Sequence, residues 1–362
     1  MQGGPETRKE AERLFAAFQK AGAEPVETAL LQPSEVLLDL YGEDIRARAY
    51  VTSDPVLGEQ MLRPDFTVPI VQAHMTNGAE PARYTYMGEV FRQQEAGTGR
   101  PSEYMQVGYE VFDRSDPAAA DAEVFALFAK ALTGHDLQGS IGDIGVLVAA
   151  VQGLTTSERR RAALMRHIWR PARFKALLER FAGRAPAPEG RAELVSSLEG
   201  LDVAQIVRAA GPEIGLRRAR EVVARLETLR DDRDVAPIPE DEIEAVSAIL
   251  NLKLPADDAA GALAEIAAGF PVIKEAAQGV VRRLHALIER GVDVAALTYE
   301  GAYGRTSMEY YDGFVFGFAR GGAAPVASGG RYDALTRVLG QGREIPAVGG
   351  VIRPALLLEG KP

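Results

Sequence analysis

The sequence predicts an α+β fold in which an antiparallel sheet is flanked by helices and interrupted by a helical insertion. Three observations support this prediction. Two amphipathic strands at 84–92 and 104–112 are joined by a connection rich in glycine that ends in proline, which is typical of a hairpin. From residue 155 to 277, Ala, Arg, Glu and Leu recur with helical spacing, and strand-like segments then return. Residues 1–154 and 278–362 are therefore predicted to form one split core around an insertion at 155–277.

The first element is a helix between residues 6 and 21. Leu14 and Phe18 belong to an apolar stripe with helical spacing, and Gly22 ends the helix. Strands are expected next, near 47–52 and 60–63.

A second helix is expected over residues 68–77. Pro64 fixes the backbone ahead of it, and either Asp65 or Thr67 can cap its first turn. Capping alone would be enough to explain the presence of these two polar residues.

The hairpin is the most informative part of the chain because each of its strands carries a glycine on a polar face. Side chains alternate between the two faces of a strand, so Arg92 shares a face with Gly88, and Gln106 and Glu110 share one with Gly108. A glycine inside a strand often marks the close approach of a ligand or of another backbone. We therefore expect a ligand-binding surface here. The alternative is a sheet whose polar face is simply open to solvent.

The remaining elements follow from the same two periodicities. Phe125 and Phe128 point inward from a helix that begins at a proline, and Gly291 ends a later helix. The expected elements are a helix over 117–132, a strand at 142–148, a helix over 280–290, and strands at 293–300, 311–319 and 350–352.

Composition excludes several classes of function. The formal net charge of −10 and the isoelectric point near 5.2 argue against a broad basic surface for nucleic acid. The chain has no cysteine, and its four histidines lack the spacing of metal ligands, so no metal site is expected. No apolar run is long enough to span a membrane, and no secretory signal is evident. We expect a cytoplasmic protein without a cofactor.

Four segments follow one another along the chain: Leu62-Arg63-Pro64-Asp65-Phe66-Thr67, Gly88-Glu89-Val90-Phe91-Arg92, Gln106-Val107-Gly108-Tyr109-Glu110-Val111-Phe112 and Tyr310-Tyr311. In this order they resemble the catalytic core of class II aminoacyl-tRNA synthetases, specifically the histidyl branch. Its corresponding segments are Leu-Arg-Pro-Glu-Gly-Thr, motif 2, Gln-Leu-Gly-Cys-Glu-Val-Phe and a pair of tyrosines. The resemblance implies the antiparallel sheet of that class.

The resemblance also implies roles for individual residues in an amino-acid pocket. Asp65 and Thr67 would hold the amino group of the ligand, and Arg92 would face its carboxylate and the phosphate of an adenylate. Gln106 and Glu110 would contact the amino acid. The other implied contacts are Tyr310 and Tyr311 beside an imidazole, and Arg100 as a possible contact from the loop.

Departures from the synthetase pattern argue against tRNA charging. The family's arginine ahead of the paired tyrosines falls on Thr306, with Arg305 one residue out of register. The Glu-Arg pair of motif 3 falls on Ala355 and Leu356, and Pro354 is expected to interrupt the helix there. The resemblance stops before any anticodon-binding domain, so we expect none.

These departures are typical of the family of ATP phosphoribosyltransferase regulatory subunits, which this chain resembles over roughly residues 5–150 and 285–353. The segments Arg63–Pro69, Val90–Gln94 and Ala120–Val124 support this reading. The resemblance implies a non-catalytic subunit that activates a short-form catalytic subunit in the first step of histidine biosynthesis. It further implies histidine as the feedback effector, and a homodimer within a hetero-oligomer.

Other interpretations stay open. One is a tRNA-independent ligase that activates an amino acid with ATP, in which Arg353 is the nearest candidate to replace the motif 3 arginine. Another is a histidine-sensing module with a different partner. The sequence also leaves open whether histidine binds in the pocket or at a subunit interface.

Overall fold

The computed structural model describes residues 4–34, 48–94, 101–186, 189–212, 218–305 and 310–359. The chain forms two compact units. One combines Met1–Ala149 with Ala248–Pro362, and the other is Ala150–Ser247. We call them the sheet unit and the helical unit.

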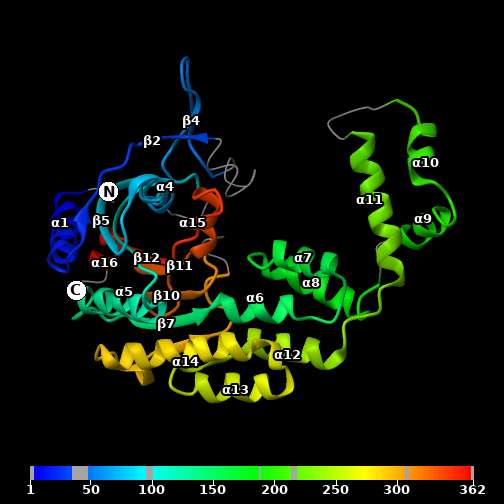
Figure 1. Ribbon diagram of the computed structural model, residues 1–362. Helices are drawn as coiled ribbons and strands as arrows, with labels where there is room; N and C mark the ends of the chain where they lie inside the picture. Colours follow the sequence, from blue (N-terminus) through cyan, green and yellow to red (C-terminus); the bar gives the residue numbers. More distant parts are fainter. Residues whose placement is uncertain are drawn as a thin grey trace. The chain divides into compact units, whose positions relative to one another are not determined.

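The sheet unit is built on a nine-stranded sheet that is mostly antiparallel, as predicted (Figure 1). Only the β1–β5 and β7–β9 pairs are parallel among the described strands. In spatial order the strands are β1 (Glu24–Pro25), β5 (Ala82–Phe91), β6 (Glu103–Phe112), β12 (Ala347–Ile352), β11 (Ala327–Arg331), β10 (Phe314–Ala319), β7 (Gln138–Asp143), β9 (Thr298–Glu300) and β8 (Lys253–Pro255).

The predicted hairpin is the β5–β6 pair. Its register places Gly88 opposite Gln106, Tyr86 opposite Gly108 and Tyr84 opposite Glu110. The expected alternation of faces is therefore confirmed, and Glu110 lies on the face that carries the glycines.

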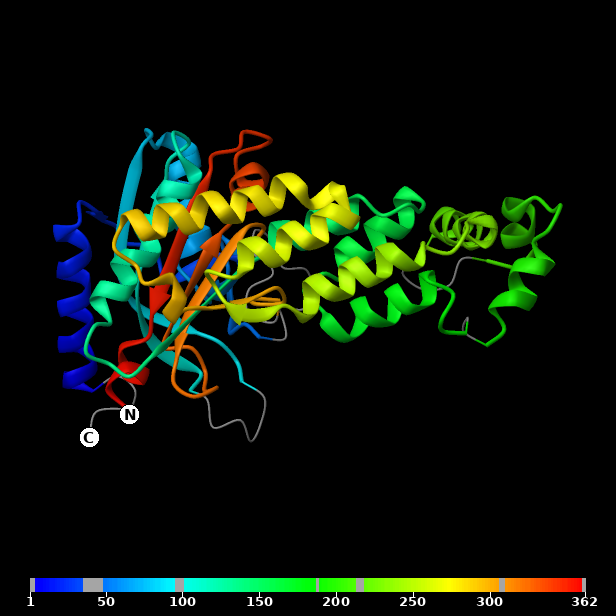
Figure 2. The same ribbon diagram turned by 90° about the horizontal axis from the view of Figure 1, so that it is seen from below.

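Helices cover the other face of this sheet, as Figure 2 shows. They are α1 (Pro5–Lys20), α5 (Pro117–Ala131) and α14 (Lys274–Glu289), with α13 (Ala259–Gly269) packed on α14. Aromatic side chains hold this layer together. The ring centroids of Phe18 and Tyr109 are 5.5 Å apart, and those of Phe125 and Phe316 are also 5.5 Å apart. Such pairs bury large apolar areas and add about 1 kcal/mol beyond the area term.

Smaller elements complete the sheet unit. A second sheet has three strands, in the order β2 (Leu31–Pro33), β4 (Gly58–Leu62) and β3 (Val51–Asp54). The remaining described helices are α4 (Thr67–Asn77), α15 (Asp333–Leu339), α16 (Pro354–Leu358), η2 (Pro271–Ile273) and η3 (Val294–Ala296), and α4 packs against α15.

The helical unit contains α7 (Glu158–Arg166), α8 (Pro171–Phe181), α9 (Arg191–Ser197), α10 (Val203–Ala209), α11 (Ala219–Asp231) and η1 (Asp232–Asp234). Its core includes Phe174 and Leu178 of α8. Arg160 of α7 is buried, and its Nε donates to Asp232 Oδ1 over 2.7 Å, which ties α7 to η1. The boundaries of this unit lie within α6 (Ile144–Gln152) and α12 (Glu240–Asn251).

The structure differs from the sequence prediction in several places. A strand was predicted at 293–300, but Val294–Ala296 form η3, and only Thr298–Glu300 is a strand. The helical unit ends at Ser247, whereas the insertion was predicted to reach residue 277. β8 and α13 belong to the sheet unit, because β8 pairs with β9 and α13 packs on α14. A helical repeat of apolar residues does not reveal which neighbour a helix will cover.

Two further differences concern helix starts. The strand predicted at 142–148 ends at Asp143, whose Oδ1 accepts a hydrogen bond from the backbone N–H of Gly145 over 2.7 Å and so starts α6. Pro354 begins α16 instead of interrupting a helix, because the first helical position needs no N–H donor. None of the helices that the structure describes is both long and apolar enough to cross a membrane.

Candidate functional site

A buried carboxylate, Glu110 of β6, lies at the centre of the glycine-bearing face. Its Oε1 accepts hydrogen bonds from Thr67 Oγ1 over 3.0 Å and from the Tyr86 hydroxyl over 2.9 Å. Its Oε2 accepts one from the Tyr332 hydroxyl over 2.6 Å. No Lys, Arg or His among the described residues forms an ion pair with Glu110. The carboxylate is thus held by three neutral donors.

The lack of a cation determines the electrostatics of Glu110. Burial raises the pKa of its carboxyl to about 7, although the hydrogen bonds from Tyr332, Tyr86 and Thr67 oppose that rise. A group with this pKa changes charge near neutral pH. A ligand that brings a positive charge or an N–H donor to Glu110 would favour the ionised form.

Glycines make room for these side chains. A Cβ on Gly108 would lie 2.1 Å from Tyr86 Cζ, and a Cβ on Gly349 of β12 would lie 1.5 Å from Glu110 Oε2. Both distances are far below van der Waals contact, so a side chain at either position would require Tyr86 or Glu110 to move. Polar side chains of the site occupy the space that a Cβ would fill at these two positions.

Asp65 and Thr67 lie where the chain enters α4. The N-cap of α4 is Phe66, whose side chain makes no capping hydrogen bond, but Oδ1 of the preceding Asp65 accepts a hydrogen bond from the backbone N–H of Val68 in the first turn over 3.2 Å. Thr67 is buried, and its hydroxyl donates a hydrogen bond to Glu110. Asp65 therefore satisfies an N–H group of the first helical turn, whereas Thr67 does not.

Two arginines fix this entry segment to the hairpin. Arg92 Nε donates to the Pro64 carbonyl over 2.8 Å. Arg63 is buried, with its Nε on the Glu89 carbonyl at 2.8 Å and its guanidinium 4.0 Å from the centroid of the Phe66 ring. Arg92 thus reaches the same segment that carries Asp65 and Thr67.

Gln106 lies four residues before Glu110 along β6 and on the same face. It is 1% exposed, and its Oε1 accepts no hydrogen bond from any residue that the structure describes. An unsatisfied buried carbonyl costs on the order of 1–3 kcal/mol, and sites of this kind are typically completed by a ligand or a water.

The paired tyrosines lie against the same site. The ring centroids of Tyr310 and Tyr311 are 5.0 Å apart, and that of Tyr310 is 6.0 Å from Tyr332. Burial raises the pKa of the Tyr311 hydroxyl, and the negative charge of Glu110 raises it further. Tyr311 is therefore close enough to Glu110 to be affected by its charge.

The structure brings together the seven residues that the sequence indicated for the pocket. The loop contact, Arg100, was an eighth. The seven are Asp65, Thr67, Arg92, Gln106, Glu110, Tyr310 and Tyr311. Arg100 and Thr306 lie outside the described residues. Arg305 is buried, and burial lowers the pKa of its guanidinium.

Sequence reasoning missed two members of the site, Tyr86 and Tyr332. Tyr86 could have been found, because the alternation along β5 places it on the face that carries Gly88. Tyr332 follows β11, and only the strand order of the sheet brings it to Glu110. No local pattern predicts that contact.

Arg353, the alternative cation, follows β12. Its Nη1 donates to the Pro325 carbonyl over 2.6 Å. Burial lowers the pKa of its guanidinium, and the positive charge of Arg92 adds to that effect. Among the described residues, no group of three His, Cys, Asp or Glu side chains could hold a metal ion.

Comparison with known proteins identifies relatives along most of the chain. Residues 5–235 and 223–356 match the histidyl-tRNA synthetase family. An ATP phosphoribosyltransferase regulatory subunit from Agrobacterium fabrum is 33% identical over 94% of this chain and 93% of its own. Another with the same name, from Allorhizobium ampelinum, is 34% identical over 93% of each chain.

Solved structures show the same fold. An ATP phosphoribosyltransferase regulatory subunit/histidyl-tRNA synthetase from Bacillus halodurans has a TM-score of 0.68, with 21% identity over 98% of this chain and 78% of its own. A histidine–tRNA ligase subunit from Alicyclobacillus acidocaldarius has a TM-score of 0.61, with 22% identity over 99% and 95% of the two chains.

Proposed function

This chain belongs to the family of ATP phosphoribosyltransferase regulatory subunits, which has the histidyl-tRNA synthetase fold, and we propose that it senses histidine in the pocket around Glu110. Family membership assigns it a regulatory role in histidine biosynthesis. We further propose that it activates a short-form catalytic subunit and relays histidine feedback to it, as a homodimer within a hetero-oligomer.

The observation that carries the proposal is a buried carboxylate that accepts only from neutral donors among the described residues, on the same face of β6 as a buried amide oxygen to which no described residue donates. Histidine brings an ammonium and an imidazole N–H, which are the kinds of group that Glu110 and Gln106 Oε1 can accept from. Asp65 and Thr67 lie beside Glu110 to contact the ammonium, and Arg92 has the charge to hold the carboxylate of the amino acid.

Calorimetric titration of the chain with histidine tests this placement. We expect Glu110→Ala to weaken histidine binding at least tenfold, since it removes a charge-assisted contact from a buried site. Glu275→Ala, which removes an exposed carboxylate of α14, is the matched control and should leave the affinity unchanged. An unchanged affinity in Glu110→Ala would mean that histidine binds at another site.

Histidinol tests the role of Arg92 separately, because it keeps the ammonium and the imidazole but lacks the carboxylate. We expect histidinol to bind more weakly than histidine to the wild-type chain. The two ligands should bind about equally to Arg92→Gln. A difference that survives in the variant would assign the carboxylate to another cation.

The regulatory part of the proposal requires the catalytic partner. Formation of phosphoribosyl-ATP by a short-form catalytic subunit is measured with and without this chain, across a histidine titration. Histidine can regulate only if it binds one state of the complex more tightly than another. We expect activity that depends on this chain and falls with histidine, and activity indifferent to the chain would overturn the proposal.

We also propose that the chain is not itself a ligase. The motif 3 pair of the synthetases is replaced by Ala355 and Leu356, neither of which can stabilise the charge of ATP phosphates. The guanidinium of Arg353, the alternative cation, already donates to the Pro325 carbonyl. Exchange of pyrophosphate into ATP, measured with a panel of amino acids, should show no amino-acid dependence, and any such dependence would support the ligase.

A further inference from the structure

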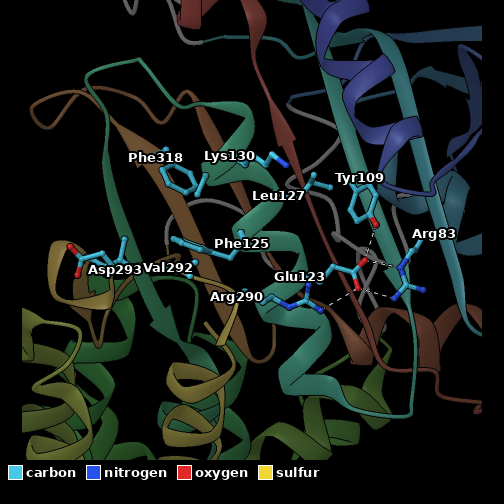
Figure 3. Close-up of a pocket in the computed structure, with 15 residues that line it drawn as sticks. Arg83, Tyr109, Glu123, Phe125, Leu127, Lys130, Arg290, Val292, Asp293 and Phe318 are labelled. Carbon is cyan, nitrogen blue, oxygen red and sulfur yellow. Dashed lines mark hydrogen bonds and ion pairs between the residues drawn. The ribbon is translucent and has the colours of Figure 1, made fainter. Parts of the chain in front are cut away.

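The carboxylates of the sheet unit differ in the groups that hold them. Glu123 of α5 lies in a cavity on the helical side of the sheet, where Figure 3 shows Arg83 and the Tyr109 hydroxyl directed at it. Arg83 donates to Glu123 from Nε over 2.6 Å and from Nη2 over 2.8 Å. Burial would raise the pKa of this carboxyl, but the hydrogen bonds from Arg83 and Tyr109 lower it. Glu123 is therefore balanced by a cation of its own.

Asp312, which follows the paired tyrosines, is held by backbone groups instead. Its Oδ1 accepts a hydrogen bond from the N–H of Asp333 over 3.0 Å, and its Oδ2 accepts one from the N–H of Ala334 over 2.5 Å. No described residue forms an ion pair with Asp312, and the ion pairs of Arg331 are with Asp121 and Asp333. Both carboxylate oxygens of Asp312 are thus used by the first turn of α15.

Backbone hydrogen bonds fix the position of Asp312 itself. Its N–H donates to the Arg331 carbonyl over 3.0 Å. The carbonyl of the next residue, Gly313, accepts from the N–H of Ile144 at the start of α6 over 2.9 Å. Tyr311, the preceding residue, is buried. The carboxylate of Asp312 is therefore carried by a segment that is held on both sides.

Tyr332 is the residue that this carboxylate can keep in place. It lies between β11 and α15, directly before the two residues whose N–H groups donate to Asp312. Its own N–H donates to the Ala347 carbonyl over 3.0 Å, and its hydroxyl donates to Glu110 Oε2 over 2.6 Å. A hydrogen bond weakens steeply when its distance or angle changes, so a shift in the first turn of α15 would weaken the contact of Tyr332 with Glu110.

We propose that Asp312 is a positioning residue of the Glu110 pocket, which holds Tyr332 against the carboxylate of Glu110 and so raises the affinity for histidine. This inference rests on the function proposed above and concerns the same site. Asp312 acts through Tyr332 and not by contact with the ligand. A carboxylate suits this role because each of its two oxygens accepts from one backbone N–H, whereas an amide has only one oxygen.

A double-mutant cycle of Asp312→Ala and Tyr332→Phe, measured by calorimetric titration with histidine, tests the proposal. At about pH 8 the imidazole of histidine is neutral, and the carboxyls of Glu110 and Asp312, with pKa values of about 7, are mostly ionised. Tyr332→Phe should weaken histidine binding roughly fivefold, since it removes a hydrogen bond to a buried charged group. Asp312→Ala should weaken binding about threefold in the wild-type background. It should have no further effect in the Tyr332→Phe background, where the hydroxyl that Asp312 positions is absent.

An equal loss in both backgrounds would show that Asp312 acts independently of Tyr332, and the proposal would be wrong. An unchanged affinity of Asp312→Ala in the wild-type background would also overturn it. Asp312→Asn keeps one accepting oxygen, so its affinity for histidine should lie between those of the wild type and Asp312→Ala. The same cycle is made with Asp312→Asn if Asp312→Ala does not fold.

Asp116→Ala is the matched control. The Oδ1 of Asp116 accepts from the N–H of Ala119 over 3.0 Å at the start of α5, so this variant also removes an aspartate from the first turn of a helix. α5 covers the opposite face of the sheet. Asp116→Ala should lower the temperature of unfolding and bind histidine as the wild type does. Weaker histidine binding in Asp116→Ala would mean that affinity follows stability alone, which contradicts a positioning role for Asp312.

Glu110→Ala separates this proposal from the function proposed above. If Glu110→Ala weakens histidine binding and Asp312→Ala does not, histidine binds in the pocket and only the role of Asp312 is wrong. If neither variant weakens binding, histidine binds at another site and both proposals are wrong.

Discussion

At the scale of single residues, the ionisation of Glu110 should set part of the pH dependence of stability. Its pKa is about 7 in the folded protein, against 4.5 for an unperturbed glutamate. At a pH between these two pKa values, Glu110 is protonated in the folded state and ionised in the unfolded chain. The free energy of unfolding therefore falls as the pH rises from about 4.5 through about 7. We expect roughly 1 kcal/mol of the stability difference between about pH 6 and about pH 8 to come from Glu110.

Chemical denaturation of the wild type and Glu110→Gln at both pH values measures this contribution. The pH dependence of the variant is subtracted from that of the wild type, because burial also raises the pKa of Asp312 to about 7. Asp312 is present in both proteins, so its contribution cancels. Stability should fall less steeply with pH in the variant. Parallel pH profiles would mean that Glu110 does not titrate in this range.

Gly349 provides a second test at the residue scale. A Cβ there would overlap Glu110 Oε2, so Gly349→Ala should displace the carboxylate, lower the stability by on the order of 2–4 kcal/mol and weaken histidine binding. Gly261 in α13 is the control, because a Cβ added there meets nothing within 4 Å. Gly261→Ala should stabilise the chain by up to about 1 kcal/mol. Calorimetry and denaturation report both effects, and wild-type histidine binding in Gly349→Ala would exclude Glu110 from the site.

At the scale of elements, a buried ion network joins two helices to the sheet. Asp121 of α5 is 1% exposed and accepts from Arg283 of α14 and Arg331 of β11, each over 2.7 Å. We expect Asp121→Ala to lower the free energy of unfolding by roughly 3–5 kcal/mol, because it leaves buried arginines short of a partner. Glu275→Ala breaks an exposed pair on the same α14 and should cost less than about 1 kcal/mol. Similar losses in both variants would show that the network does not join these elements.

The elements also show what the sequence can predict. The faces of β5 and β6 followed from alternation alone, because the side-chain period of a strand is independent of its surroundings. The contact of Tyr332 with Glu110 depends on the order of strands in the sheet, which local pattern does not encode. The predicted strand at 142–148 failed for a related reason. A strand and a helix that are buried on all sides both have a continuous run of apolar residues, so the sequence pattern does not distinguish a strand from a helix such as α6.

At the scale of the whole molecule, feedback requires the histidine site to be coupled to the partner interface. Coupling is reciprocal in binding free energy, so the factor by which histidine changes the affinity of this chain for the catalytic subunit must equal the factor by which that subunit changes the affinity for histidine. We expect both factors to be about 5 to 150. Titrations of each ligand, with and without the other, measure them independently.

Glu110→Gln separates sensing from assembly in these titrations. The carboxylate is buried and bonds only to Thr67, Tyr86 and Tyr332 among the described residues, so its replacement should leave the partner surface unchanged. The variant should bind and activate the catalytic subunit as the wild type does, while histidine no longer changes either property. If histidine still inhibits the complex that contains Glu110→Gln, the effector acts from another site, and the pocket inherited from the synthetase fold is not the sensor.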